Sequence, residues 1–242
     1  MKPHMEKGML GAPSAAGTPY CSPTVAAPNA APAAASRARL RLCNPFSTRF
    51  VRPGAIPFVF ADGWNMDRLI ESLETNDWRG AIIGPHGSGK TSLLASLLPE
   101  LEARGIRPHP ISLHDGQRWL PRTGRSQSDE TRESRRGPTQ PRVLLVIDGY
   151  EQLNRFSRWL VARRCRRRGW GLLVTAHHTV SLPTIFAASP SLAILQAIVD
   201  RLLPSGVTTL TPVEAAEAYS RAGGNLREAL FCLYDRYQQW AN

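Results

Sequence analysis

The chain has 242 residues, 42% of them hydrophobic, and a formal net charge of +11, which suits one folded core with a small appended module. Its four cysteines are scattered without CxxC spacing, which argues against a disulfide framework and a zinc site, and no apolar run approaches the roughly 20 residues that span a bilayer. We therefore expect a cytoplasmic protein without a membrane partner.

Arginine supplies almost all of the positive charge. Lysine occurs only at Lys2, Lys7 and Lys90. An arginine bias of this kind also follows from genomic base composition, so basicity alone indicates a polyanion partner only weakly. Lys90 is the one lysine after residue 8, and its retention needs a reason of its own.

The N-terminal part of the chain divides into three segments. Residues 1–42 are rich in Ala, Pro, Gly and Ser, with too little apolar bulk to offset chain entropy, and predict a disordered arm. Residues 44–60 place four phenylalanines between prolines, which favours an extended segment packed on a core over an adenine clamp. Residues 65–77 predict a helix with one apolar face.

Strands and helices alternate after that point. The predicted strands are 81–83, 109–113, 143–147 and 171–175, and the predicted helices between them are 90–104 and 150–168. Apolar strands without internal alternation, separated by amphipathic helices, are typical of a parallel sheet covered on both faces. The pattern therefore predicts an α/β fold.

Two further segments lie outside this alternation. Residues 121–142 contain six arginines, three acids and almost nothing apolar, and predict a solvated, mobile insertion. Helices are predicted over 191–203, 212–222 and 226–240, and the last two would form a small lid.

One short motif carries the main chemical signal. The segment GPHGSGKT fits G-x-x-x-x-G-K-[ST] at every fixed position, directly after a strand and directly before a helix. Its glycines let the backbone wrap a polyphosphate with N–H groups pointing inward, and the helix start adds partial positive charge. The predicted phosphate-binding residues are Gly84, Pro85, His86, Gly87, Ser88, Gly89, Lys90, Thr91 and Ser92.

Three residues have predicted roles toward the phosphates and a metal. Lys90 would reach the β and γ phosphates, and lysine fits there because a slim ammonium enters the loop where the planar arginine fork does not. The Thr91 hydroxyl would bind Mg²⁺. Asp148 follows the apolar strand 143–147 at its carboxyl end, where ligands bind in doubly wound sheets, and would be the second metal residue.

These motifs resemble the P-loop NTPases, specifically the division with a strand between the P-loop strand and the Walker B strand, and within it the AAA+ and STAND-type ATPases. The predicted strand 109–113 and the late position of Asp148 support this resemblance. It implies a P-loop domain over 43–208 with helices on both faces of the sheet, a helical lid over 209–242, and ATP with Mg²⁺ as ligands.

The resemblance also implies residue roles. Relatives often carry a catalytic glutamate directly after the aspartate, whereas this chain has Gly149, which argues against vigorous hydrolysis. Glu151 either replaces that glutamate or supplies charge to the first turn of a helix. Thr175 matches the sensor 1 position, and Arg227 looks like the sensor 2 arginine that reaches from the lid to the nucleotide. His177 either resembles the switch histidine of some relatives or is an ordinary loop histidine.

The segment 155–168 is strongly basic. Residues 155–168 contain seven arginines and no acid. Either they form a solvated helix end, or Arg163–Arg168 contacts a nucleic acid or an acidic protein partner. Interleaved Phe156, Trp159 and Trp170 are expected to pack inward.

The predicted function is a slow, regulatory, Mg²⁺-dependent ATPase. GTP is disfavoured because the guanine motif N-K-x-D needs a lysine downstream of Lys90, and none follows. A non-hydrolysing nucleotide switch or DNA-associated adaptor is the alternative, and a small-molecule kinase is less favoured. Assembly into a homo-oligomer remains open.

Overall fold

The computed structural model describes residues 44–61, 63–114, 116, 143–203 and 210–241. The predicted arm at 1–42 and the predicted insertion at 121–142 lie outside the described residues. Among the described helices, none combines the length and the apolar character needed to cross a membrane.

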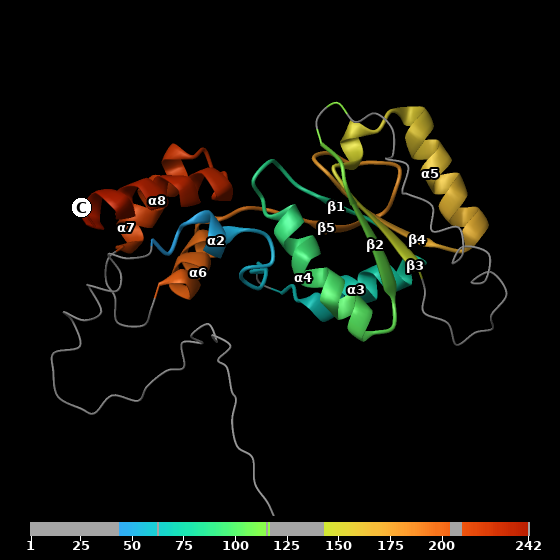
Figure 1. Cartoon of the computed structure of the whole chain (residues 1–242), viewed down its shortest axis with the longest axis horizontal. Coiled ribbons are helices and arrows are strands. Elements are labelled where there is room, and N and C mark those ends of the chain that lie inside the picture. The colour runs from blue at the N-terminus through green and yellow to red at the C-terminus, as the bar shows by residue number, and fades with distance from the viewer. Residues whose placement is uncertain (1–43, 62, 115, 117–142, 204–209, 242) are drawn as a thin grey trace, which may run out of the picture.

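A five-stranded, wholly parallel sheet forms the centre of the fold, in the order β2-β3-β4-β1-β5 (Figure 1). The strands are β1 (Arg79–Ile83), β2 (Arg107–Ser112), β3 (Val143–Asp148), β4 (Gly171–Ala176) and β5 (Thr184–Ala187). The predicted α/β class is confirmed. In the sheet, the strand between β1 and β3 is β4, whereas β2, which intervenes in sequence, lies at the edge.

Helices cover both faces of the sheet. They are α2 (Thr48–Val51), α3 (Met66–Thr75), α4 (Lys90–Ala103), α5 (Arg155–Arg168), α6 (Leu192–Leu202), α7 (Pro212–Arg221) and α8 (Leu226–Ala241), with a 3₁₀ turn, η2 (Tyr150–Gln152). Figure 1 shows α3 and α4 on the side of the sheet opposite α5. The same view places α6, α7 and α8 together beside the sheet, next to α2.

Successive strand residues separate into two cores, as the alternation of a pleated strand requires. Leu144 and Val146 of β3 pack with α3 and α4, whereas Leu145 and Ile147 pack with α5. Because both faces are buried, the strands read as continuous apolar runs in the sequence. Each fully buried leucine contributes about 1.5 to 3 kcal/mol relative to an exposed one.

A third core joins the C-terminal helices. Leu195 of α6, Ala218 of α7 and Leu233 of α8 pack around Phe46 from the N-terminal segment. The capping box of Thr211 and Glu214 fixes the start of α7.

The aromatic segment before α3 packs on the cores, as predicted. Phe58 and Phe60 lie against Phe186 of β5 in edge-to-face contacts, with ring centroids 6.2 and 5.7 Å from the Phe186 ring. The segment is not extended throughout, because Thr48–Val51 forms the short helix α2.

Two strand predictions need correction. The predicted strand 109–113 begins earlier, at Arg107, and its mostly exposed residues include two prolines, which an edge strand tolerates because one side needs no ladder hydrogen bonds. Strand β5 was not predicted, because four residues between Pro183 and Pro190 read as a loop.

The predicted helix 150–168 is also wrong in its first turn. Gly149 takes a left-handed conformation with φ of 85°, and the 3₁₀ turn η2 follows it. The chain then becomes extended at Leu153, and α5 starts only after Asn154, whose side chain accepts a hydrogen bond from Ser157 N at 2.7 Å.

The expectation that the aromatic residues of α5 pack inward is wrong. Phe156 is 58% exposed and Trp159 is 53% exposed, while Trp170, beyond the helix end, is partly buried. The side of α5 that faces the core carries the smaller residues Ser157, Val161 and Cys165, so Phe156 and Trp159 fall on the opposite side of the helix.

Candidate functional site

The loop between β1 and α4 is shaped for an anion. Gly87 and Gly89 have φ of 70° and 87°, which glycine adopts without strain. The first hydrogen bond of α4 runs from Leu93 N to Gly89 O at 2.8 Å, so the N–H groups before Leu93 have no carbonyl partner within the helix. Free amides and the positive end of the helix dipole thus meet at this loop.

Lys90 is held inside the loop. Its side chain is buried with 8% exposed, and Nζ donates to Gly84 O at 2.7 Å and to Pro85 O at 2.8 Å. Burial lowers the pKa of Lys90, and the charges of Glu151 and Asp148 act in the opposite direction. The loop therefore holds a desolvated cation, which attracts an anion more strongly than a solvated one would.

A chain of hydroxyls fixes the Asp148 carboxylate. Thr91 Oγ1 donates to Asp148 Oδ2 at 2.8 Å, and Thr175 Oγ1 donates to Asp148 Oδ1 at 2.5 Å. The Thr175 oxygen in turn accepts from Gly149 N at 3.0 Å. Strands β3 and β4 are parallel neighbours, so their carboxyl ends, which carry Asp148 and Thr175, lie side by side.

A second network links Glu151, His177 and Lys90. His177 Nε2 lies 2.9 Å from Glu151 Oε1, and His177 Nδ1 lies 3.2 Å from Lys90 Nζ. Burial, and after it the charge of Lys90, lowers the pKa of His177. A neutral ring that donates from Nε2 to the carboxylate and accepts at Nδ1 from the ammonium satisfies both contacts. The ring of His86 stacks on His177 at 3.5 Å between centroids.

Glu151 also carries an unsatisfied atom. Its Oε2 is buried and has no hydrogen-bond partner among the described residues. A buried carboxylate oxygen without a donor is costly, and a bound water or ligand would satisfy it. Glu151 therefore fits the role of a group that contacts a water molecule beside the phosphate loop.

The backbone conformation at position 149 favours glycine. Its φ is 85°, and a Cβ at this position would lie 3.0 Å from Leu113 O. Glutamate directly after Asp148 would be strained in this turn. The turn instead brings the carboxylate of Glu151, two positions later, to 2.9 Å from His177 Nε2.

The C-terminal helices touch the loop through Asn225. A Cβ on Gly87 would lie 1.7 Å from Asn225 Oδ1. The same oxygen accepts from Arg227 N at 3.0 Å and Glu228 N at 3.2 Å, so Asn225 caps α8, as its sequence position predicts. Arg227 follows Asn225 by two positions and is exposed in the first turn of α8. The contact of Asn225 with Gly87 was not predicted, and no local sequence pattern signals it.

The other predicted site residues surround this centre. Pro85 and His86 are exposed at the loop, and Ser92 is partly buried in the first turn of α4. The Oγ of Ser88 is buried and lacks a hydrogen-bond partner in the part of the chain that the structure describes. An orphaned hydroxyl inside a loop of free amides fits a bound phosphate.

The residues present also fit a divalent cation. The described residues include no group of three or more His, Cys, Asp or Glu placed to hold a metal ion. Mg²⁺ at phosphate sites takes only one or two protein oxygens and completes its shell with phosphate and water. Thr91 Oγ1 and Asp148 Oδ2, 2.8 Å apart, supply two hard oxygens at the loop.

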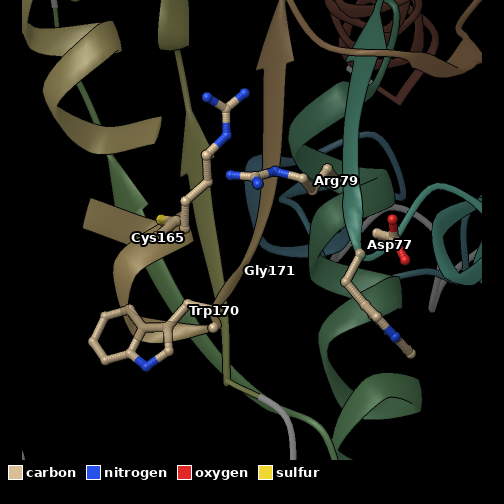
Figure 2. Close-up of a pocket in the computed structure, with 8 residues that line it drawn as sticks. Asp77, Arg79, Cys165, Trp170 and Gly171 are labelled. Carbon is tan, nitrogen blue, oxygen red and sulfur yellow. The ribbon is translucent and has the colours of Figure 1, made fainter. Parts of the chain in front are cut away.

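A pocket of about 250 Å³ lies at the other end of the strands. It is lined by the amino ends of β1 and β4 and the carboxyl end of α5, and Figure 2 shows Arg79 extending from β1 toward Cys165, with Trp170 nearby. Burial raises the pKa of the Cys165 thiol. None of the predicted phosphate-binding or catalytic residues lines this pocket.

The comparisons with known proteins give matches among solved structures alone. The chain matches no protein-family model and no curated protein. A solved structure of PCH-2 from C. elegans is similar to it over 82% of this chain and 73% of that chain, with 14% sequence identity and a TM-score of 0.39. A similarity of this size does not bear on ligand or activity, which are argued below from the site alone.

Proposed function

We propose that the protein is an ATP-binding, Mg²⁺-dependent P-loop ATPase with slow turnover and a regulatory output, similar to the AAA+ and STAND-type ATPases. The observation that carries the proposal is the buried Lys90 ammonium, held by Gly84 O and Pro85 O beside the hydrogen-bonded pair Thr91 and Asp148. A cation, free amides and two hard oxygens are the groups that a metal-bound triphosphate needs.

Phosphate binding would use the loop Gly84–Ser92. Its amides surround the phosphate oxygens, and Lys90 exchanges its two carbonyl partners for the β and γ phosphates. Exchange is favoured because burial lowers the Lys90 pKa, which means that the carbonyls only partly replace the lost hydration of the cation.

Metal binding would use Thr91 and Asp148. A Mg²⁺ ion held by these two residues would supply positive charge that offsets the charge of the phosphate oxygens. Thr175, buried at 0% exposure, holds Asp148 in position and is one hydrogen bond away from the metal residues. This arrangement supports a role for Thr175 in sensing whether the phosphate site is filled.

Hydrolysis would depend on Glu151. Its free Oε2 accepts a proton from the attacking water, while His177 holds Oε1 at 2.9 Å and orients the carboxylate. The C-terminal part, 209–242, would act as the lid of the domain 43–208. Arg227 would reach the phosphates from the first turn of α8, beside the contact of Asn225 with Gly87.

A non-hydrolysing nucleotide switch is the second candidate. The observation in its favour is that His177 contacts both Glu151 and Lys90, so phosphate binding at Lys90 can change the His177 contact without any chemistry at Glu151. Nothing in the described site favours a small-molecule kinase in the same way.

Two measurements separate these candidates. Equilibrium ATP binding should be detectable in the wild type and at least tenfold weaker in Lys90→Ala. Phosphate release should be slow but measurable in the wild type and absent in Glu151→Gln, which should still bind ATP. Tight ATP binding with no phosphate release in the wild type would select the switch, and no ATP binding in the wild type would reject both.

A further inference from the structure

The solvent side of α5 carries an unusual set of side chains, here termed the outer face of α5. With 3.6 residues per turn, the positions opposite the buried Ser157, Val161 and Cys165 form one stripe. This stripe consists of Arg155, Phe156, Trp159, Leu160, Arg163, Arg166 and Arg167, and all seven are exposed.

Apolar exposure concentrates on this stripe. Among the described residues, the exposed large hydrophobic side chains include Phe156, Trp159 and Leu160, at 58%, 53% and 48% exposure. Their place on one helix face forms a contiguous apolar strip rather than scattered single residues. Contiguous exposed apolar surface of this kind marks an interaction site.

The aromatic rings are arranged for flat ligands. The rings of Phe156 and Trp159 lie 5.9 Å apart with an interplanar angle of 29°, and the Arg163 guanidinium lies 5.3 Å from the centre of the Trp159 ring. Two stacked rings with a guanidinium over one of them form a cationic aromatic surface onto which planar groups can stack.

Charge identifies the class of partner. The helix contains seven arginines and no acid, so a second copy docked face to face would bring like charges together. A polyanion is complementary. Among polyanions, nucleic acid with unpaired bases also supplies flat rings for Phe156 and Trp159, whereas a duplex hides its bases and offers phosphates only.

A second stack lies at the carboxyl end of α5. Arg168 lies over the ring of Trp170 at 4.9 Å, and the ring of His109 is stacked on Trp170 at 5.9 Å and 8°. Arg166 belongs to the outer face and also lines the pocket that Trp170 helps to form. Cationic and aromatic groups are therefore found together at both ends of α5.

We propose that the outer face of α5 binds single-stranded nucleic acid, with bases stacked on Phe156 and Trp159 and phosphates paired with Arg163 and Arg167. This inference goes beyond nucleotide binding and does not depend on it. The phosphate loop follows the carboxyl end of β1, whereas the outer face of α5 lies on the far side of that helix from the sheet (Figure 1).

The test measures binding of the full chain, without ATP, to a fluorescent 20-nucleotide oligo(dT), its RNA counterpart, a duplex of equal length and a polyglutamate peptide. Phe156→Ala/Trp159→Ala should weaken oligo(dT) binding at least tenfold. The matched control Trp240→Ala, which removes an exposed tryptophan from α8, should change it less than twofold. Melting curves will show whether each variant folds.

A second pair of variants separates local from overall charge. Arg163→Ala/Arg167→Ala should weaken binding and flatten its salt dependence, whereas Arg52→Ala/Arg221→Ala removes the same charge elsewhere and should not. Three results would overturn the proposal. The first is equal binding of duplex and single strands that the ring substitutions do not change, and the second is tighter binding of polyglutamate than of oligo(dT). The third is no binding of any oligonucleotide by a wild-type protein that is a dimer and that Trp159→Ala converts to a monomer.

Discussion

A methyl group on Gly87 would lie 1.7 Å from Oδ1 of Asn225, so the phosphate loop and the cap of α8 are in direct contact. Asn225 lies 138 positions after Gly87, and its oxygen also holds the first turn of the last helix. A movement of this loop would therefore displace Asn225 and, through its hydrogen bonds, the first turn of α8.

This contact predicts an energetic coupling. Gly87→Ala should lower the free energy of unfolding by about 3 kcal/mol, because it adds both left-handed strain and the clash with Asn225. Asn225→Gly should cost only a few tenths of a kcal/mol, since glycine is a tolerated N-cap. In the Asn225→Gly background, Gly87→Ala should cost about 1 kcal/mol. Urea unfolding of the four proteins measures the coupling, and additive effects would show that the two residues do not touch.

The turn after Asp148 limits the positions at which the proposed catalytic carboxylate can lie. Gly149→Glu should lower stability by about 1 to 3 kcal/mol, because φ is 85° and Leu113 O lies 3.0 Å from the new Cβ, and it should not speed phosphate release. Glu151→Gln should slow phosphate release at least about 100-fold. Glu102→Gln, on the exposed side of α4, is the matched control and should retain the wild-type rate. Faster release by Gly149→Glu would place the acid at 149.

Thr175 is buried, so the loss of its hydroxyl should lower the free energy of unfolding. Thr175→Val keeps the shape but leaves Gly149 N without its acceptor and Oδ1 of Asp148 without its donor, so it should lower the free energy of unfolding by about 1 to 3 kcal/mol. Thr175→Ser keeps both hydrogen bonds and loses one buried methyl group, which should lower the free energy of unfolding by about 0.8 kcal/mol. Chemical unfolding checks both values. A valine variant as stable as the serine variant would show that the hydroxyl network adds nothing.

His177 predicts a pH dependence of stability. Burial and Lys90 lower its pKa below the ordinary 6.5, while Glu151 acts against this, and His86 adds to the lowering. Between pH 6.5 and the lower pKa of the folded state, His177 is protonated in the unfolded chain but stays neutral in the folded chain. The stability contributed by neutral His177 is thus full above pH 6.5 and is lost as pH falls through the folded-state pKa.

His177→Gln removes this titration and keeps a polar side chain. The difference in melting temperature between wild type and variant should therefore shrink as the pH is lowered from 7.5 to 5. A constant difference over that range would mean that His177 does not titrate with a lowered pKa. Measuring both proteins in the same buffers cancels the contribution of the titratable groups that do not contact His177.

The local features of the site could be predicted from the sequence, because each depends on neighbouring residues. The apolar run before Gly84, the glycines and Lys90 specify a strand, a loop and a helix in contiguous sequence. The parallel sheet then brings the ends of β3 and β4 together, which is why Asp148 and Thr175 meet.

The remaining contacts join distant segments and leave no local signal. Glu151 and His177 are 26 positions apart, and their pairing depends on the turn at Gly149, which in the sequence looks like a lost glutamate. The outward rings of Phe156 and Trp159 were misread because hydrophobicity predicts burial on average, whereas here the small side of α5 faces the sheet.

The central claim is that Lys90 binds a nucleotide phosphate, and calorimetric titration of ATP with Mg²⁺ into wild type and Lys90→Ala tests it most directly. Because Lys90→Ala also removes the hydrogen bonds to Gly84 O and Pro85 O, a melting curve of the variant must first show that it is folded. The account predicts measurable ATP affinity in the wild type and at least tenfold weaker affinity, or about 1.4 kcal/mol, in the folded variant. Equal and negligible ATP affinity in both proteins would contradict it.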